Sequence, residues 1–165
     1  ITLLFSDIEG STAMTERLGD QQAQEVLRAH NTIFRQHVAE CGGFEVKSMG
    51  DGFMLTFASA GRGVACAVAI QKELADGAQD LGSGGLAVRI GLAVGEPIRE
   101  GENLFGKAVS LASRITDKAD GGQVLVSGIV RALVGAGDDY TFRKSGAFEL
   151  KGISGPQMLH EVVWS

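Results

Sequence analysis

Two aspartates and a lysine stand beside predicted turns. Asp51 lies in the glycine-flanked turn at residues 50–52, and Lys47 precedes that turn by three residues. Asp7 follows an apolar run at residues 1–5 and could face Asp51. Hard divalent cations prefer carboxylate oxygens, and two carboxylates held close together repel each other unless a cation lies between them. The pattern predicts a metal site, with a surface hairpin carrying solvated charges as the alternative.

The residues after Asp7 predict a phosphate-binding turn. The segment Gly10-Ser11-Thr12 leads from a strand into a helix-compatible sequence. The first N–H groups of a helix have no intrahelical acceptor and lie at the positive end of its dipole, where they bind anions. Ser11 or Thr12 is also the expected N-cap of that helix.

A second set of polar groups lies along a helix predicted from Gly106 to about Lys118. At 100° per residue, Lys107, Ser110 and Arg114 fall opposite an apolar arc, and Asn103 joins them if the helical turn extends back that far. A guanidinium is a rigid fork of donors suited to phosphate oxygens. The face is therefore either a ligand-binding row or an ordinary solvated surface.

Composition limits the class of protein. The 165 residues predict one domain with a sizeable core, and the abrupt start in a strand predicts that it belongs to a longer protein. A net charge of −5 without a Lys/Arg run argues against a nucleic-acid partner, and no apolar stretch is long enough for membrane contact by this domain. Cys41 and Cys66 stand in apolar, helix-like contexts, which favours buried thiols in a reducing cytoplasm.

The elements that position these residues alternate along the chain. The apolar run at residues 1–5 predicts a central strand, and segments near 44–57, 86–95, 123–126, 140–144, 148–151 and 158–163 predict further strands. Helices are expected over about 20–41, from Ser59 to the loop at 82–85, over 106–118, and from Ser127 to Leu133, with a hairpin or arm near 96–102. We expect an α+β fold in which helices pack on one mostly antiparallel sheet.

Three motifs follow one another along the chain: Phe5-Ser6-Asp7-Ile8-Glu9-Gly10-Ser11-Thr12, Lys47-Ser48-Met49-Gly50-Asp51-Gly52 and Asn103-Leu104-Phe105-Gly106-Lys107-Ala108-Val109-Ser110-Leu111-Ala112-Ser113-Arg114. Together they resemble the class III nucleotidyl cyclases, in the order and spacing of that family. The similarity extends over essentially the whole chain and is greatest to the compact, short-armed subgroup common in actinobacteria.

This resemblance implies a ferredoxin-like core and conversion of ATP to 3′,5′-cyclic AMP and pyrophosphate. It also implies two Mg²⁺ or Mn²⁺ ions and a head-to-tail homodimer with shared active sites. By the motifs, Asp7, Asp51 and the Ile8 carbonyl bind metal, while Gly10, Ser11 and Thr12 contact phosphates. Lys47 and Asn103 match the adenine-reading positions, Ser110 the ribose position, Arg114 the transition-state arginine, and Lys151 the triphosphate lysine.

Two positions depart from the adenylyl cyclase pattern. Asn103 stands where these enzymes usually carry an aspartate, and an amide offers both a donor and an acceptor, so GTP becomes a second expected substrate beside ATP. Ser110 replaces a longer asparagine and would reach the ribose only through water, which predicts slow turnover.

Two alternatives to an active cyclase remain. A catalytically silent domain that binds nucleotide to regulate a neighbouring domain is favoured by positions 103 and 110, whereas intact Asp7, Asp51, Lys47, Arg114 and Lys151 favour catalysis. A domain that condenses two GTP molecules shares the two-metal logic, but its Gly-Gly-Asp/Glu-Glu/Asp-Phe signature is absent from the sequence. No histidine stands in a motif, so no side-chain base is predicted.

Overall fold

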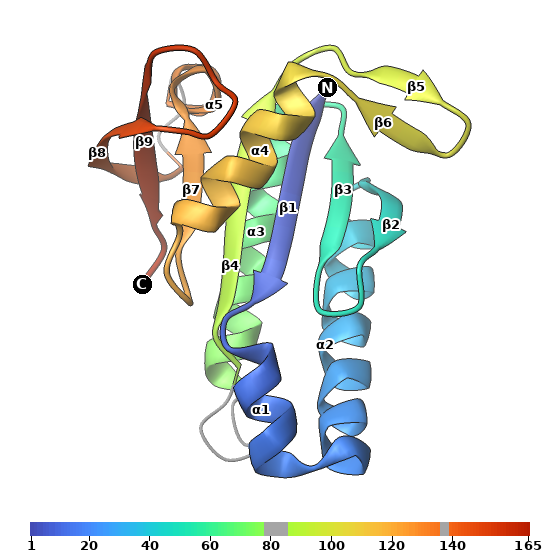
Figure 1. Cartoon of the computed structure of the whole chain (residues 1–165). Helices are drawn as coiled ribbons and strands as arrows, with labels where there is room; N and C mark the ends of the chain where they lie inside the picture. The colour runs from blue at the N-terminus through green and yellow to red at the C-terminus, as the bar shows by residue number, and fades with distance from the viewer. Residues whose placement is uncertain (78–85, 136–138) are drawn as a thin grey trace.

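The computed structural model describes residues 1–77, 86–135 and 139–165. Within these residues a seven-stranded sheet has the order β2-β3-β1-β4-β7-β9-β8, and a two-stranded arm, β5-β6, extends beyond it (Figure 1). Neighbouring strands of the sheet pair antiparallel except β4 and β7, which are parallel. The predicted α+β fold with a mostly antiparallel sheet is confirmed.

The strands are β1 (Thr2–Ile8), β2 (Phe44–Ser48), β3 (Phe53–Phe57), β4 (Val88–Val94), β5 (Ile98–Glu100), β6 (Asn103–Phe105), β7 (Val124–Ser127), β8 (Thr141–Glu149) and β9 (Pro156–Val163). The helices are α1 (Ser11–Leu18), α2 (Asp20–Glu40), α3 (Ala60–Asp76), α4 (Lys107–Lys118) and α5 (Gly128–Val134). Ser59 and Ser127 cap α3 and α5 as predicted, each accepting a hydrogen bond from a backbone N–H in the first turn.

Helices cover both faces of the sheet. Residues of α2, α3 and α5 share one apolar cluster with Leu4 of β1, whereas α4 packs on the opposite face with Leu3 and Phe5. Side chains of a strand alternate between faces, so the middle of a strand with helices on both sides is apolar on both faces. This explains the consecutive apolar residues Leu3, Leu4 and Phe5 in β1.

The helix α4 buries the face that its sequence predicts. Ala112, Ile115 and Ala119 are buried, whereas Lys107 and Ser110 are exposed. The buried Thr116 hydroxyl donates to the carbonyl oxygens of Ala112 and Phe5, at 2.8 and 3.3 Å. These contacts hold α4 against β1 and β4, with its polar groups directed away from the sheet.

Several predicted boundaries are wrong. The first strand continues past Phe5 to Ile8, so Asp7 lies within a strand. Asn103 lies in β6 and not on an extension of α4, because Gly106 ends the arm and serves as the helix N-cap. The pieces predicted at 140–144 and 148–151 form one strand, β8, whose irregularity between Lys144 and Gly146 keeps its pairing with β9 continuous.

The predicted loop at residues 82–85 lies outside the described residues. In the part of the chain that is described, no helix has both the length and the apolar character needed to cross a membrane.

Candidate active site

Asp7 is positioned by the pairing of two central strands. In the antiparallel register of β1 and β4, Asp7 lies opposite Arg89. Arg89 donates from Nε to Asp7 Oδ1 at 2.6 Å and from Nη2 to Oδ2 at 3.0 Å. These hydrogen bonds raise the pKa of the Arg89 guanidinium. Asp7 is therefore held in one orientation by a two-pronged charged contact.

Asp51 reaches the same place from the β2–β3 hairpin. Gly50 supplies the positive φ (85°) that the turn needs, and Gly52 serves a different purpose. A Cβ at Gly52 would lie 1.9 Å from the Ser6 carbonyl oxygen, so only glycine lets the hairpin approach β1 this closely. The prediction of a hairpin is confirmed, and the glycine with positive φ is the one before Asp51.

Three hydrogen bonds fix the hairpin beside β1. The Ile8 N–H donates to the Asp51 carbonyl oxygen at 3.0 Å, and the Phe53 N–H donates to Ser6 Oγ at 3.0 Å. Ser11 Oγ donates to Asp51 Oδ2 at 3.0 Å. The Asp51 carboxylate is therefore oriented by the first residue of α1.

Ser11 consequently does not cap its own helix. Gly10 is the N-cap of α1 and no side chain accepts a bond from the first turn, so the predicted Ser11 or Thr12 cap is wrong. The hydroxyl of Ser11 is committed to Asp51. The amides of the first helical turn are left without a side-chain acceptor, as an anion site requires.

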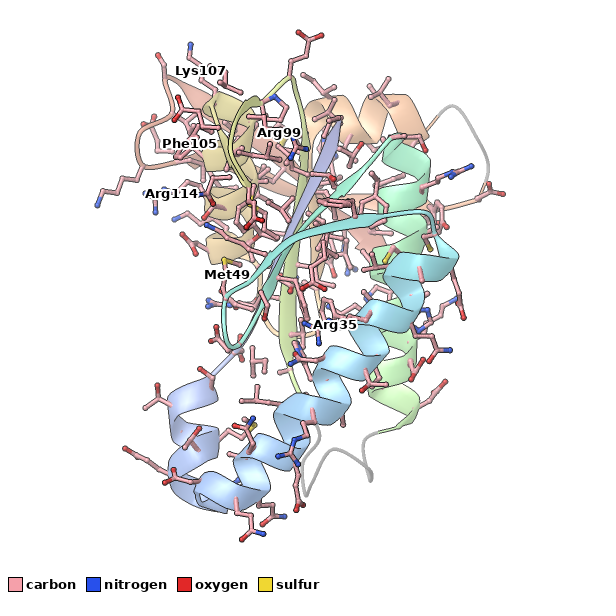
Figure 2. The ribbon with its side chains drawn as sticks, turned by 90° about the vertical axis from the view of Figure 1, so that its right-hand side faces the viewer. Arg35, Met49, Arg99, Phe105, Lys107 and Arg114 are labelled. Atoms are coloured by element: carbon pink, nitrogen blue, oxygen red, sulfur yellow. The ribbon has the colours of Figure 1, made fainter. Side chains whose placement is uncertain are left out.

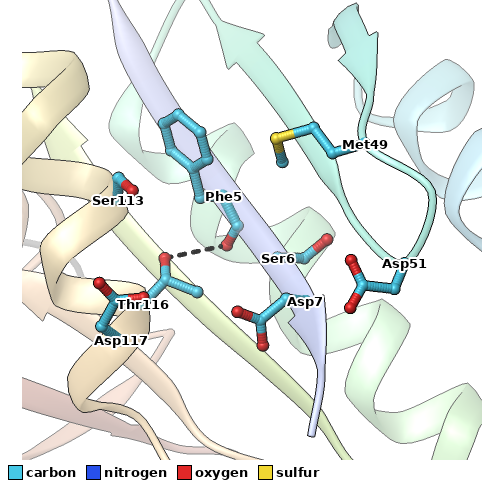
Figure 3. Close-up of a pocket in the computed structure, with 8 residues that line it drawn as sticks. All are labelled: Phe5, Ser6, Asp7, Met49, Asp51, Ser113, Thr116 and Asp117. Carbon is cyan, nitrogen blue, oxygen red and sulfur yellow. Dashed lines mark hydrogen bonds between the residues drawn. The ribbon is translucent and has the colours of Figure 1, made fainter. Parts of the chain in front are cut away.

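Asp7 and Asp51 line one cavity of about 200 Å³ (Figure 3). Residues of β1, of the hairpin and of α4 form its wall: Phe5, Ser6, Asp7, Met49, Asp51, Ser113, Thr116 and Asp117. Asp7 lies on β1 between Asp51 on one side and Asp117 of α4 on the other (Figure 3). Three carboxylates thus border one small polar space.

A buried aromatic stack supports the hairpin from α2. The ring of His30 lies 4.5 Å from that of Phe34 and 5.8 Å from that of Phe53. His30 is fully buried, its Nδ1 contacts Asn31 Oδ1 at 2.9 Å, and its Nε2 has no partner among the described residues. Burial lowers the pKa of His30, while Asn31 and the nearby charge of Asp51 act in the opposite direction. His30 is therefore a core residue beneath the site, as its place on the apolar stripe predicts.

The structure does not bring the other predicted residues to this cavity. Lys47, Asn103, Ser110 and Lys151 are exposed, and none of them lines it. Arg114 is half-buried and pairs with Asp117 at 3.5 Å. Figure 2 shows Arg114, Lys107, Phe105 and Met49 along one side of the molecule, at the left of the view, where α4 lies.

The donor set at the cavity suits a hard divalent cation. Asp7 and Asp51 supply carboxylate oxygens. Ile8 does not line this cavity, and its backbone N–H, not its carbonyl oxygen, contacts Asp51. Within the described ranges, no group of three or more His, Cys, Asp or Glu side chains could hold a metal ion. Two carboxylates fit Mg²⁺ or Mn²⁺, which often keep several positions for water and substrate phosphates.

Sequence reasoning missed Arg89 and Asp117. A signal for Arg89 was present, because it is the one charged residue within the apolar strand Val88–Val94. A lone charge in a central strand needs a partner on the neighbouring strand. Asp117 gave no such signal, because an aspartate on an exposed helix face is common.

Comparison with known proteins identifies the family. The model of the adenylate and guanylate cyclase catalytic domain matches residues 1–163. The chain therefore belongs to the class III nucleotidyl cyclase catalytic domains.

Its relatives make both kinds of cyclic nucleotide. The adenylate cyclase of Mycosarcoma maydis is 32% identical over 151 residues, which cover 77% of this chain and 6% of that protein. The adenylyl cyclase CyaB of P. aeruginosa has a similar structure, with a TM-score of 0.86 and 24% identity over 99% of this chain and 93% of that one. The guanylyl cyclase Cya2 superposes with a TM-score of 0.84 at 26% identity, covering 98% and 90% of the two chains. The chain spans a small part of its curated relatives, 6% and 12% of the first two.

Proposed function

We propose that this domain converts ATP to 3′,5′-cyclic AMP and pyrophosphate, with GTP as a second substrate. The observation that carries the proposal is the convergence of Asp7 of β1 and Asp51 of the β2–β3 turn on one cavity, where each carboxylate accepts a side-chain hydrogen bond. Such an arrangement suits phosphoryl chemistry, because two metal ions can lower the pKa of the attacking hydroxyl and neutralise the leaving group.

The reaction needs in-line geometry. The ribose 3′-oxygen forms a bond to the α-phosphorus as the bond to the pyrophosphate oxygen breaks, and the hydroxyl proton is released. Asp7, Asp51 and the Ile8 carbonyl would hold the two ions, and the first turn of α1 (Gly10, Ser11, Thr12) would contact phosphate oxygens. Ser11 has a further task, because its hydroxyl orients Asp51.

The remaining residues act from a second subunit in this proposal. Lys47, Asn103, Ser110 and Lys151 are exposed and do not line the cavity of their own chain, which leaves them free to contact a nucleotide bound to a second subunit. Lys47 and Asn103 would read the purine, Ser110 would contact the ribose and Lys151 the triphosphate. Arg114 would stabilise charge that develops on the α-phosphate. A head-to-tail homodimer brings these groups to the partner's Asp7 and Asp51.

The alternative is a nucleotide-binding regulatory module with little activity. Ser110 and Asn103 favour it, because both weaken the contacts expected to ribose and adenine. Product analysis separates the two functions: purified domain is incubated with ATP or GTP and with Mn²⁺ or Mg²⁺, and products are separated by chromatography. If the domain is a cyclase, we expect cyclic AMP from ATP as the main product and a smaller amount of cyclic GMP from GTP. Binding of nucleotide without any cyclic product would establish the regulatory function instead.

A further inference from the structure

The Asp7–Arg89 pair competes with the proposed use of Asp7. Each Asp7 oxygen accepts from a different guanidinium nitrogen, at 2.6 and 3.0 Å. Asp51 differs, because a neutral hydroxyl contacts only its Oδ2. The two carboxylates of one cavity are therefore in different states: Asp7 is neutralised by a cation of the chain itself and Asp51 is not.

We propose that Arg89 is the resting counter-ion of Asp7 and must leave it before a divalent cation binds. This inference rests on the proposed function, in which Asp7 is a metal ligand. A bidentate guanidinium covers the two oxygens that the cation would use, and its positive charge repels a second cation at close range. Arg89 is thus a positioning residue that sets metal affinity, and not only a part of the strand pairing.

The surroundings of Arg89 allow this exchange. Its side chain is 29% exposed and that of Asp7 is 26% exposed, so the pair is partly open to solvent. Asp117 and Glu9 also attract the guanidinium, which gives it other anions to move toward within the chain. A triphosphate would bring a stronger anion into the same space.

Two consequences follow for binding. Without nucleotide, the cation must displace Arg89 and binds weakly. With nucleotide present, the phosphates offer Arg89 another partner, so metal and nucleotide each strengthen the binding of the other by the same factor. Arg89 carries part of this coupling.

The test measures Mn²⁺ binding by isothermal titration calorimetry and by electron paramagnetic resonance of free Mn²⁺. Wild type is compared with Arg89→Gln, with and without a triphosphate analogue that lacks the 3′-hydroxyl. We expect Arg89→Gln to bind Mn²⁺ about tenfold more tightly than wild type without nucleotide, because the competing charge is gone. We also expect the gain in Mn²⁺ affinity on adding nucleotide to be smaller in the variant than in wild type.

A matched control is available at the other side of the sheet. Arg143 of β8 also lies opposite an acidic residue, Glu161 of β9, and contacts it at 3.2 Å. Arg143→Gln removes the same charge from a cross-strand pair at the edge of the sheet, on strands that do not pair with β1. The Mn²⁺ affinity of this variant should stay within about twofold of that of wild type. Arg89→Lys frees one oxygen of Asp7 and should also bind Mn²⁺ more tightly than wild type. If circular dichroism shows that Arg89→Gln does not fold, Arg89→Lys is used in its place.

Equal or weaker Mn²⁺ binding by the folded Arg89 variants would overturn the inference, and would mean that Arg89 only orients Asp7. Asp7→Asn tests the underlying function separately. If Asp7→Asn leaves Mn²⁺ binding unchanged, Asp7 is not a metal ligand and the proposed function itself fails. If Asp7→Asn abolishes binding while Arg89→Gln does not tighten it, only the role of Arg89 is wrong.

Discussion

The region around β1 and the β2–β3 hairpin differs sharply from the outer region of α4, the arm and the β8–β9 turn. In the first region, Asp7 and Asp51 are fixed by Arg89, Ser11 and backbone hydrogen bonds. In the second, Asn103, Ser110 and Lys151 are exposed, and Arg114 has one contact at 3.5 Å. The two carboxylates proposed to bind metal are thus held by other groups of the same chain, whereas the residues proposed to read the nucleotide are exposed.

This contrast supports a shared active site. An exposed charged side chain contributes little to the stability of the fold and is free to bind a ligand. We therefore propose that one subunit presents an organised metal site and the other presents the groups that read the nucleotide.

Removal of Asp51 should have the largest effect. We expect Asp51→Ala to reduce cyclic AMP formation by at least about 1,000-fold, because one of two metal-binding carboxylates is lost. The measurement is initial rate with ATP and Mn²⁺. Asp76→Ala, at the exposed end of α3, is the control and should retain full activity. Substantial cyclic AMP formation by Asp51→Ala would show that the Asp51 carboxylate is not needed for the reaction.

Loss of the Ser11 hydroxyl should have an intermediate effect. Ser11→Ala removes the donor at 3.0 Å from Asp51 Oδ2 without removing a charge. We expect kcat to fall about tenfold and the Mn²⁺ concentration for half-maximal rate to rise, because Asp51 is no longer held in one orientation. Thr32→Ala, which removes an exposed hydroxyl on α2, serves as control. Unchanged Mn²⁺ dependence in Ser11→Ala would show that the hydrogen bond does not organise the site.

Exchange of Asn103 should change selectivity and leave the metal site intact. A carboxylate accepts from the adenine amino group and repels the guanine carbonyl oxygen, so Asn103→Asp should raise the ATP:GTP ratio of kcat/KM about fivefold. The Mn²⁺ dependence should not move. If the ATP:GTP ratio of kcat/KM in Asn103→Asp is equal to or lower than that of wild type, position 103 does not determine purine selectivity.

The smallest effect concerns the buried histidine beneath the hairpin. Burial lowers the pKa of His30, so the folded state favours neutral imidazole while the unfolded chain takes up a proton below pH of about 6.5. The unfolded state then binds more protons, and stability falls as the pH drops below that value, by at most about 1.4 kcal/mol per pH unit.

His30→Phe keeps an aromatic ring beside Phe34 and Phe53 and removes the titration. Urea unfolding at pH 7.5 and 5.5 should show a smaller loss of stability in His30→Phe than in wild type. Burial also lowers the pKa of His160 in β9, but His160 is less buried than His30, so His160→Gln should keep more of the wild-type loss of stability than His30→Phe does. Identical pH dependence of His30→Phe and wild type would mean that His30 does not limit the acid stability of this region.

The sequence predicted the fold in the places where local pattern determines structure. The apolar run of β1, the polar face of α4 and the Ser59 and Ser127 caps all depend on neighbours in the chain, and all are confirmed. The boundaries of β8 were wrong, because the small residues between Lys144 and Ala147 show no alternation, and only pairing with β9 extends the strand.

Contacts that depend on strand register could not be predicted from the sequence. Asp7 meets Arg89 because β1 and β4 pair in one register, and residue spacing does not show which register that is. Ser11 was predicted as a cap because its type and place suit one, yet the approach of the hairpin offers it a charged acceptor instead. The convergence of Asp7 and Asp51 was predictable from motifs. The lone charge of Arg89 in an apolar strand indicated that it needs a partner, but the sequence did not show that the partner is Asp7, nor that Ser11 holds Asp51.

The most direct test of the shared site is complementation between two inactive variants. In the proposed dimer, Asp51→Ala mixed with Arg114→Ala forms heterodimers in which one site keeps both Asp51 and Arg114. Random exchange makes half of the dimers mixed, so activity should recover to about one quarter of wild type. A mixture of Asp51→Ala with the Asp51→Ala/Arg114→Ala double variant should stay inactive. Absence of recovery in the first mixture, with heterodimers verified by differential tags, would contradict a site built from two subunits.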